Sequence, residues 1–335
     1  MASASVNIWR RGDAPRAAGP HDYGYFGPES VVWRVVTHPA TALVGGQVTF
    51  LFELAHRDMQ AVMLGHDPAV RAALARRGHS LQWVRRAQRT VGVPVPLLLG
   101  DTPTADRVAA HLRRMHAKMS GVVPGTVGEH YAAGSAELVV FAHVTIAHAF
   151  LRTYEALAYR DGHGPARLPD AERDRYFREF VPLATLMGAP ASMVPDSASA
   201  VAEYYASIAD RYETLPEWQA ALPAMGLATL SPRRLRHLAS APGALWYDAT
   251  LVAAFAIAPR SVRRLYGVPR LLDLPLERSL DATRAAFASL AIPAVGDRAL
   301  AGVIGPDGVE LVRAARRTMA ATTSVPARAE HLLAA

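Results

Sequence analysis

Apolar side chains recur at the 3.6-residue period of an α-helix through almost every segment of this sequence long enough to form an element. The clearest case lies in the middle of the chain, between Ser135 and Tyr159. No segment alternates apolar and polar residues for long enough to build a sheet, and the sequence has no internal repeat. We therefore predict an all-α fold of roughly ten helices. The buried stripe predicted for the central helix consists of Ala136, Val140, His143, Ala147, Phe150 and Tyr154.

The ends of the chain differ from its middle. Residues 1–24 are rich in Gly, Pro, Arg and Ala and show no periodicity, which predicts a flexible N-terminal arm. Residues 25–320 form the predicted helical domain, and residues 321–335 form a C-terminal tail. With 335 residues and a hydrophobic content of 51%, the chain is long enough to bury a large core.

Capping residues and glycines predict several helix boundaries. Thr102 and Pro103 are typical of a helix start, and Gly121 is typical of a helix end. Near the C-terminus, Asp307 is the predicted cap of a helix over Gly308–Met319. The apolar stripe predicted for the helix that starts at Thr102 consists of Val108, Leu112, Met115 and Met119.

The sequence contains no cysteine, and this restricts its chemistry. Disulfides, thiolate iron ligands, zinc ribbons and iron–sulfur clusters are all excluded. Histidine, aspartate, glutamate and tyrosine are then the only strong metal-ligand types. Any metal chemistry must use a histidine or an oxygen ligand.

The formal net charge of +7 comes almost entirely from arginine, because Lys118 is the only lysine. The arginines are scattered among acidic residues, as in Asp170–Arg178, and this pattern indicates solvated helix faces. We therefore expect no nucleic-acid partner.

Nothing in the sequence predicts export or a membrane span. Arg10 and Arg11 are not followed by the apolar stretch of a secretory signal. The most apolar windows are shorter than the about 20 residues needed to cross a bilayer, so they are predicted to be buried core helices. The predicted location is cytoplasmic.

His143 is the most unusual residue of the central helix, because it interrupts an apolar face. A buried histidine is costly unless both ring nitrogens find partners. Two explanations stay open: a core histidine satisfied by hydrogen bonds, or a ligand of a metal or a haem iron. Ala147 is small enough to let a flat macrocycle approach, and Phe150 continues the wall. His148 lies about 140° further around the helix, so the two histidines cannot face one iron.

Arg113, Arg114 and His116 form a second polar group, on the preceding predicted helix. Paired arginines suit the anchoring of carboxylates or haem propionates, because they stay charged and donate two hydrogen bonds. His116 lies at the border of the apolar stripe, where it could point into a cavity. The alternative explanation is a basic outer face with one boundary histidine.

Glu53 and His56 have the Glu-x-x-His spacing of helical di-iron sites. Those sites need two such pairs and two further glutamates, and the second pair is missing from this sequence. We therefore predict that Glu53 and His56 bind no di-iron centre. The sequence also lacks the Gly-x-Ser-x-Gly motif that would support a serine hydrolase.

Several motifs follow one another between Phe26 and Gly267. They are Phe26–Val35, Glu53–His56, Arg113–Ala117 with Gly121, Gly128 with Tyr131, Glu137–Thr145 and Ala258–Gly267. Together, and in this order, they resemble the family of the MpaB oxygenases and, more distantly, the latex-clearing rubber oxygenases.

The chain departs from this family at a few motif positions. Arg57 stands where the family usually has a proline after the histidine. Phe141 and Val144 replace the tryptophan and alanine of a Trp-x-His-Ala-Thr type of motif. His116 and Ala117 replace the last two residues of the Arg-x-x-Lys-Thr pattern found in latex-clearing members.

The resemblance implies a globin-related helical fold that binds b-type haem through one histidine and uses dioxygen, in some members to cleave isoprenoid double bonds. His143 occupies the position of the family's histidine, so the resemblance makes it the axial iron ligand. His116 would then be a distal hydrogen-bond donor or a second iron ligand. The remaining residues expected near the haem, as propionate or distal contacts or as pocket walls, are Arg34, His56, Arg113, Arg114, Ala147 and Phe150.

Two functions are consistent with these features. The first is an oxidoreductase, a haem-dependent oxygenase that uses dioxygen, and an electron donor where one is needed, on an apolar substrate such as an isoprenoid or polyketide-like molecule. The second is a non-enzymatic haem protein, serving as a carrier, sensor or electron-transfer partner, in which His143 and His116 both bind the iron. An oxygenase requires an exchangeable sixth iron site, and a six-coordinate carrier lacks one. The sequence leaves the oligomeric state open.

Overall fold

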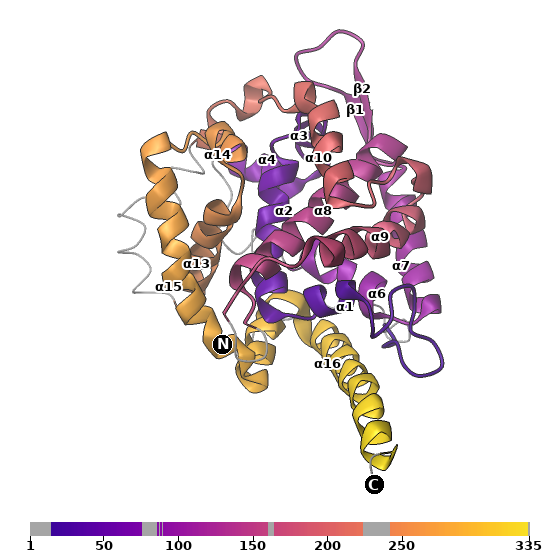
Figure 1. The fold of residues 1–335 in the computed structure, drawn as a ribbon. Helices are drawn as coiled ribbons and strands as arrows, with labels where there is room; N and C mark the ends of the chain where they lie inside the picture. Colours follow the sequence, from indigo (N-terminus) through magenta and orange to yellow (C-terminus); the bar gives the residue numbers. More distant parts are fainter. Residues whose placement is uncertain are drawn as a thin grey trace.

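The computed structural model describes residues 15–75, 86, 88, 90–159, 164–223 and 242–333. These residues are mostly helical, with one short hairpin, so the predicted all-α fold is confirmed (Figure 1). The predicted relation to globins stays a prediction.

The α-helices are α1 (Val31–Val36), α2 (Gly46–Glu53), α3 (Arg57–His66), α4 (Pro68–Leu74), α6 (Pro94–Leu99), α7 (Thr102–His116), α8 (Ala136–Leu157), α9 (Asp170–Leu186), α10 (Ala198–Ser207), α13 (Pro242–Ile257), α14 (Arg260–Leu265), α15 (Asp273–Ala288) and α16 (Pro293–Leu333). Short turns of other helix types are the π-helix η1 (Thr41–Gly45) and the 3₁₀ turns η2 (Ala191–Met193), η3 (Ala209–Arg211), η4 (Pro216–Trp218), η5 (Arg270–Leu272) and η6 (Ser289–Ala291).

The central helix α8 begins as the sequence predicts, since the Ser135 hydroxyl accepts a hydrogen bond from the Leu138 backbone N–H at 3.3 Å. It is surrounded by α1, α2, η1, α9, α13 and α15. By length and apolar composition α8 could also cross a bilayer, but 67% of its most apolar window is buried within the fold. The bent pair Arg270–Ala291 and Pro293–Thr322 passes the same test only when taken as one span, with a bend of 107°. These contacts and this degree of burial are typical of a core helix.

The helices before α8 dock through specific polar anchors as well as apolar contact. Ser30 caps α1, accepting a hydrogen bond from the Trp33 backbone N–H at 3.0 Å. The Trp33 indole donates to the Leu98 carbonyl at 2.9 Å, which fixes α1 against α6. Asp101, one residue earlier than the sequence suggests, caps α7 by accepting from the Thr104 backbone N–H at 3.0 Å.

The predicted end of the α7 helix at Gly121 is wrong. The helix ends at His116, and Gly121 lies in a two-stranded antiparallel hairpin of β1 (Ser120–Val122) and β2 (His130–Ala132). Gly121 pairs with Tyr131, and a Cβ at Gly121 would lie 2.7 Å from the Tyr131 hydroxyl. The glycine therefore permits a close strand contact. The predicted α7 stripe also needs correction at Met115, whose side chain is 37% exposed.

The C-terminal helix α16 starts at Pro293 and is interrupted at Gly305, whose φ of 74° is in the left-handed region. A helical segment therefore begins after Gly305, close to the start predicted at Gly308, but the break lies two residues before the predicted cap Asp307. The segment predicted as a tail from residue 321 continues α16 to Leu333. Figure 1 shows α16 extending away from the body of the molecule.

Residues 15–24, in the predicted N-terminal arm, lie against the start of α7. The Ala18 backbone N–H donates to the Leu99 carbonyl at 3.1 Å. The Asp22 carboxylate accepts hydrogen bonds from the Thr102 backbone N–H and hydroxyl at 2.9 and 2.8 Å. Residues 1–14 of the arm lie outside the described residues.

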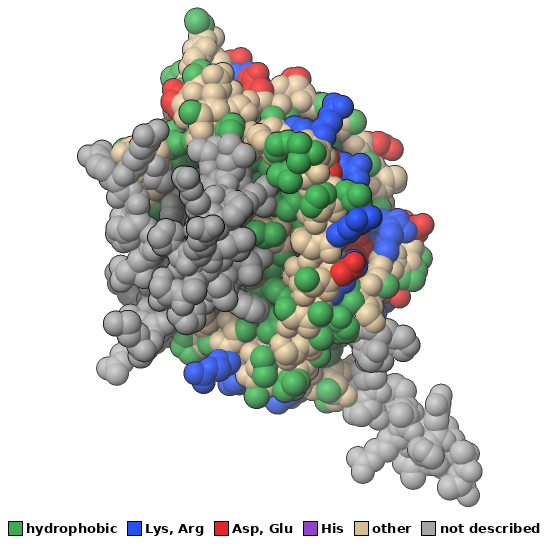
Figure 2. Space-filling model, turned by 90° about the vertical axis from the view of Figure 1, so that its left-hand side faces the viewer, with side chains coloured by type: hydrophobic (Ala, Val, Ile, Leu, Met, Phe, Trp, Pro, Cys, Tyr) green, Lys and Arg blue, Asp and Glu red, His purple; other side chains and the backbone are tan. Residues whose placement is uncertain are grey.

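Arginines pair with acids across the surface, as the mixed charges of one face in Figure 2 illustrate. Arg57 contacts Glu129 and Glu213, each at an N–O distance of 2.6 Å. Arg211 contacts Asp58 at 2.5 Å and Glu129 at 3.4 Å. These charges join α3, the hairpin loop and the chain after α10 into one network.

Candidate haem site

His143 lies on the side of α8 that faces α9. Its ring is only 4% exposed, and its centroid is 5.4 Å from that of Phe180. Ala147 is one turn further along, and its carbonyl accepts a hydrogen bond from the Tyr176 hydroxyl of α9 at 2.9 Å. Phe150 continues the same buried side. The sequence therefore predicted correctly that these α8 residues are buried.

Burial makes His143 a neutral imidazole, because it lowers the pKa of the ring to about 3. The Nδ1 atom is buried and has no hydrogen-bond partner. A buried nitrogen without a partner costs free energy comparable to a lost hydrogen bond, so its presence calls for an explanation. A neutral ring with an unused nitrogen is the donor that haem iron binds, so this residue fits the haem implied by the resemblance.

Arg34 and Arg113 do not converge beside His143. Arg34 forms an ion pair with Glu172 at the start of α9, and Arg113 donates to the carbonyl of Leu186 at the end of α9. These two partners are about 20 Å apart along the helix axis, given a rise of about 1.5 Å per residue. The two arginines therefore cannot hold the neighbouring propionates of one haem in this arrangement.

His56 lies on the other side of α8 from His143. Its ring is 4.3 Å from that of Phe141, which is two residues before His143 and therefore points about 160° away from it. The His56 Nδ1 atom caps α3 by accepting a hydrogen bond from the Asp58 backbone N–H at 3.2 Å. Burial lowers the pKa of His56 to about 4. His56 thus has a local structural role and does not share a site with His143.

His116 occupies the last turn of α7 and is half-buried, at the end of the helix side that buries Ala105, Ala109 and Leu112. Burial lowers the pKa of His116, so its ring is neutral at pH 7. Arg114, on the same turn, is exposed.

A group of aromatic residues around His148 was not predicted from the sequence. The His148 Nδ1 atom is 3.3 Å from the Tyr205 hydroxyl, and the ring is 5.5 Å from that of Phe52. Tyr205 is in turn 6.3 Å from Tyr212, which contacts Phe141. The adjacent tyrosines 204 and 205 were the available signal, but their partner on α8 depends on tertiary packing.

Glu53 is a second titratable group in the interior. Burial raises its pKa to about 7, and the charge of Arg86 partly opposes this. Glu53 ends α2 whereas His56 caps α3, so the Glu-x-x-His pair does not lie on one continuous helix. Among the residues that the structure describes, no three His, Asp or Glu side chains are grouped so as to bind a metal ion. The absence of a di-iron centre stays a prediction.

Comparison with known families identified a match over most of the chain. The model of the family described as ER-bound oxygenase mpaB/B'/Rubber oxygenase, catalytic domain, matches residues 33–292. The chain belongs to this family of oxygenases. The match extends beyond the last motif at Gly267 and includes α15. Searches of the curated proteins and of the solved structures found no match.

Acidification is expected to destabilise the fold between about pH 6.5 and 3, because the folded state holds His143 and His148 neutral. Burial lowers the pKa of each ring from 6.5 to about 3. The unfolded chain therefore binds protons in this interval that the folded chain does not, and stability falls as the pH falls. Each histidine contributes about 1.4 kcal/mol per pH unit, or about 2 kcal/mol between pH 6.5 and 5.

Urea unfolding at pH 7 and pH 5 measures this effect. His148→Phe removes one of these groups and should reduce the acid-induced loss of stability by about 2 kcal/mol. His130→Gln, which replaces an exposed ring, is the control and should leave the loss as in the wild type. An equal loss in the wild type and in His148→Phe would contradict the account.

Proposed function

We propose that this chain is a b-type haem-dependent oxygenase that uses dioxygen on an apolar substrate, with His143 as the axial iron ligand. The observation that carries the proposal is the unpartnered Nδ1 atom of a buried, neutral histidine at the family's histidine position. Membership of an oxygenase family supports the reaction class. The absence of cysteine requires the haem to be held without thioether bonds.

The chain's own residues would position and shield the cofactor. When bound, the haem supplies the activation of dioxygen. His143 provides one nitrogen and needs no deprotonation at neutral pH, since its pKa is about 3. Phe180, Ala147 and Phe150 keep water from this side of α8. An apolar substrate is the class that such a lining favours, because it binds without losing hydrogen bonds to water.

Haem content tests the proposal directly. The wild type, expressed with adequate iron, should give a pyridine haemochrome spectrum, and His143→Ala should lose most of the haem because the only axial donor proposed is removed. His148→Ala is the matched control, since it removes a second, partly buried histidine of the same helix that has Tyr205 as its partner. Well-folded wild type without haem, or His143→Ala with a full complement, would overturn the proposal.

Carbon monoxide separates an oxygenase from a six-coordinate carrier. Reduced wild-type protein should change its absorption spectrum when carbon monoxide is added, because an oxygenase leaves the sixth iron site open to a small ligand. A spectrum indifferent to carbon monoxide would instead indicate that a second side chain, such as His116, occupies that site.

His116 is the proposed hydrogen-bond donor for the reaction. Its neutral ring, at the inner edge of α7, can stabilise charge that develops on oxygen. His116→Ala should keep the haem and lower turnover by about a hundredfold, the usual effect of removing one preorganised donor. His111→Ala, five residues earlier and exposed, should have no effect. If His116→Ala turned over at the wild-type rate, His116 would have only a packing role.

A further inference from the structure

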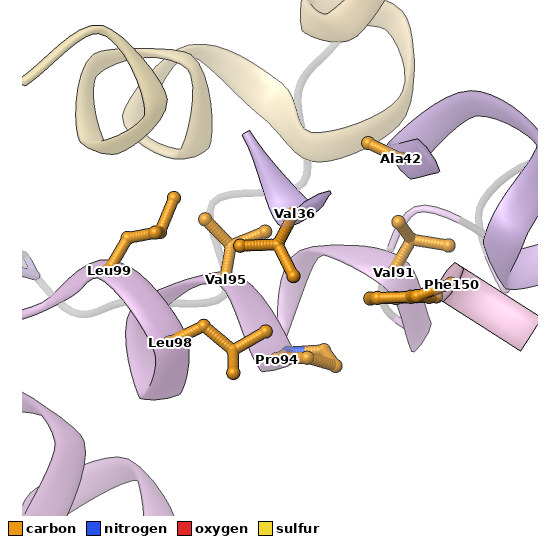
Figure 3. Close-up of a pocket in the computed structure, with 8 residues that line it drawn as sticks. All are labelled: Val36, Ala42, Val91, Pro94, Val95, Leu98, Leu99 and Phe150. Carbon is orange, nitrogen blue, oxygen red and sulfur yellow. The ribbon is translucent and has the colours of Figure 1, made fainter. Parts of the chain in front are cut away.

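A small apolar cavity lies beside the α8 side that carries His143, between α1, η1, α6 and α8 (Figure 3). Its volume is about 20 Å³. The side chains around it are exclusively apolar. They belong to Val36, Ala42, Val91, Pro94, Val95, Leu98, Leu99 and Phe150.

The backbone beside the cavity is irregular, and it brings two of the lining side chains into close contact with η1 and the start of α2. Ala42 belongs to the π-helix η1, a conformation that is frequent at functional sites. A Cβ at Gly45, the last residue of η1, would lie 2.9 Å from the Phe150 ring, and a Cβ at Gly46 would lie 2.4 Å from Val91. The two glycines therefore allow Phe150 and Val91 to approach the backbone closely. These contacts define the space between the walls.

Size and polarity restrict what the cavity can hold. A volume of about 20 Å³ exceeds the about 10 to 15 Å³ that one water molecule requires, and it is far below the several hundred Å³ of a pocket for an isoprenoid. A buried water also needs polar partners, which none of these side chains offers. Empty cavities in proteins are apolar, and larger ones of about 150 Å³ stay dry and accept apolar molecules such as benzene or xenon.

We infer that this cavity is a binding site for molecular dioxygen. Dioxygen is apolar and has only two heavy atoms, so it matches the space in both size and polarity. Phe150 lies two turns from His143 on the same side of α8, about 10 Å along the helix, which places the cavity near the proposed reaction site. The inference rests on the proposed use of dioxygen, and it assigns the cavity to that co-substrate and not to the larger one.

Two probes test the site without turnover. Xenon should occupy the cavity in crystals of the protein pressurised with the gas. In solution, dissolved dioxygen is paramagnetic, so the methyl signals of Val95 and Leu98 should relax several-fold faster in oxygen-saturated than in nitrogen-saturated samples. The methyl groups of Val201, equally buried in α10, provide the internal reference.

Two substitutions with opposite expected effects on gas binding distinguish a change in the cavity from a general folding defect. Val36→Ile adds one methylene to the wall and should abolish xenon binding and the oxygen-dependent relaxation. Leu98→Ala enlarges the space and should increase both. Val201→Ile is the matched control and should change neither.

Ordered water in the cavity, absence of xenon, or equal oxygen-dependent relaxation at Leu98 and Val201 would overturn the inference. These readouts do not require a haem. A protein that lacked haem but passed these tests would refute the proposed function and leave the gas site in place.

Discussion

The burial of most of α8, whose most apolar window is 67% buried, determines how the surrounding helices pack. Each polar side chain on the buried sides of such a helix must find its partner inside the protein. Thr145 and Thr153 do so by donating to carbonyls of the preceding turn, that of Phe141 at 3.0 Å and that of Ala149 at 2.7 Å. His148 has Tyr205 as its partner. The Nδ1 atom of His143 is left without one, which makes it the exception that a bound cofactor would explain.

The two sides of α8 thus have different chemistry. The side toward α9 carries His143 and, two turns on, Phe150 at the edge of an apolar cavity. The opposite side carries His148 and Phe141 within a group of aromatic rings that extends to His56 and Tyr212. The Arg57 network joins α3 and the hairpin next to this second group. Such a division would let one helix carry the proposed reaction site on one side and contribute to the stability of the fold on the other.

Much of this arrangement follows from local sequence signals. The Ser135 cap and the burial of His143, Ala147 and Phe150 were predictable because caps and helical periodicity act within a few residues. The hairpin was not, since its strands have three residues each and no apolar alternation. The π-helix, the ion pair of Arg34 with Glu172 and the hydrogen bond from Arg113 to the Leu186 carbonyl depend on contacts between distant segments. A sequence pattern can indicate that an arginine binds a partner, but the identity of that partner depends on tertiary packing.

Chemical rescue of His143→Gly shows whether the nitrogen of this one ring holds the iron. We expect the variant to lose the wild-type absorption spectrum and added imidazole to restore it, since a free ring can enter the space vacated by the side chain. His148→Gly should keep the wild-type spectrum and be insensitive to imidazole. A His143→Gly protein that binds haem with an unchanged spectrum, with or without imidazole, would contradict the account.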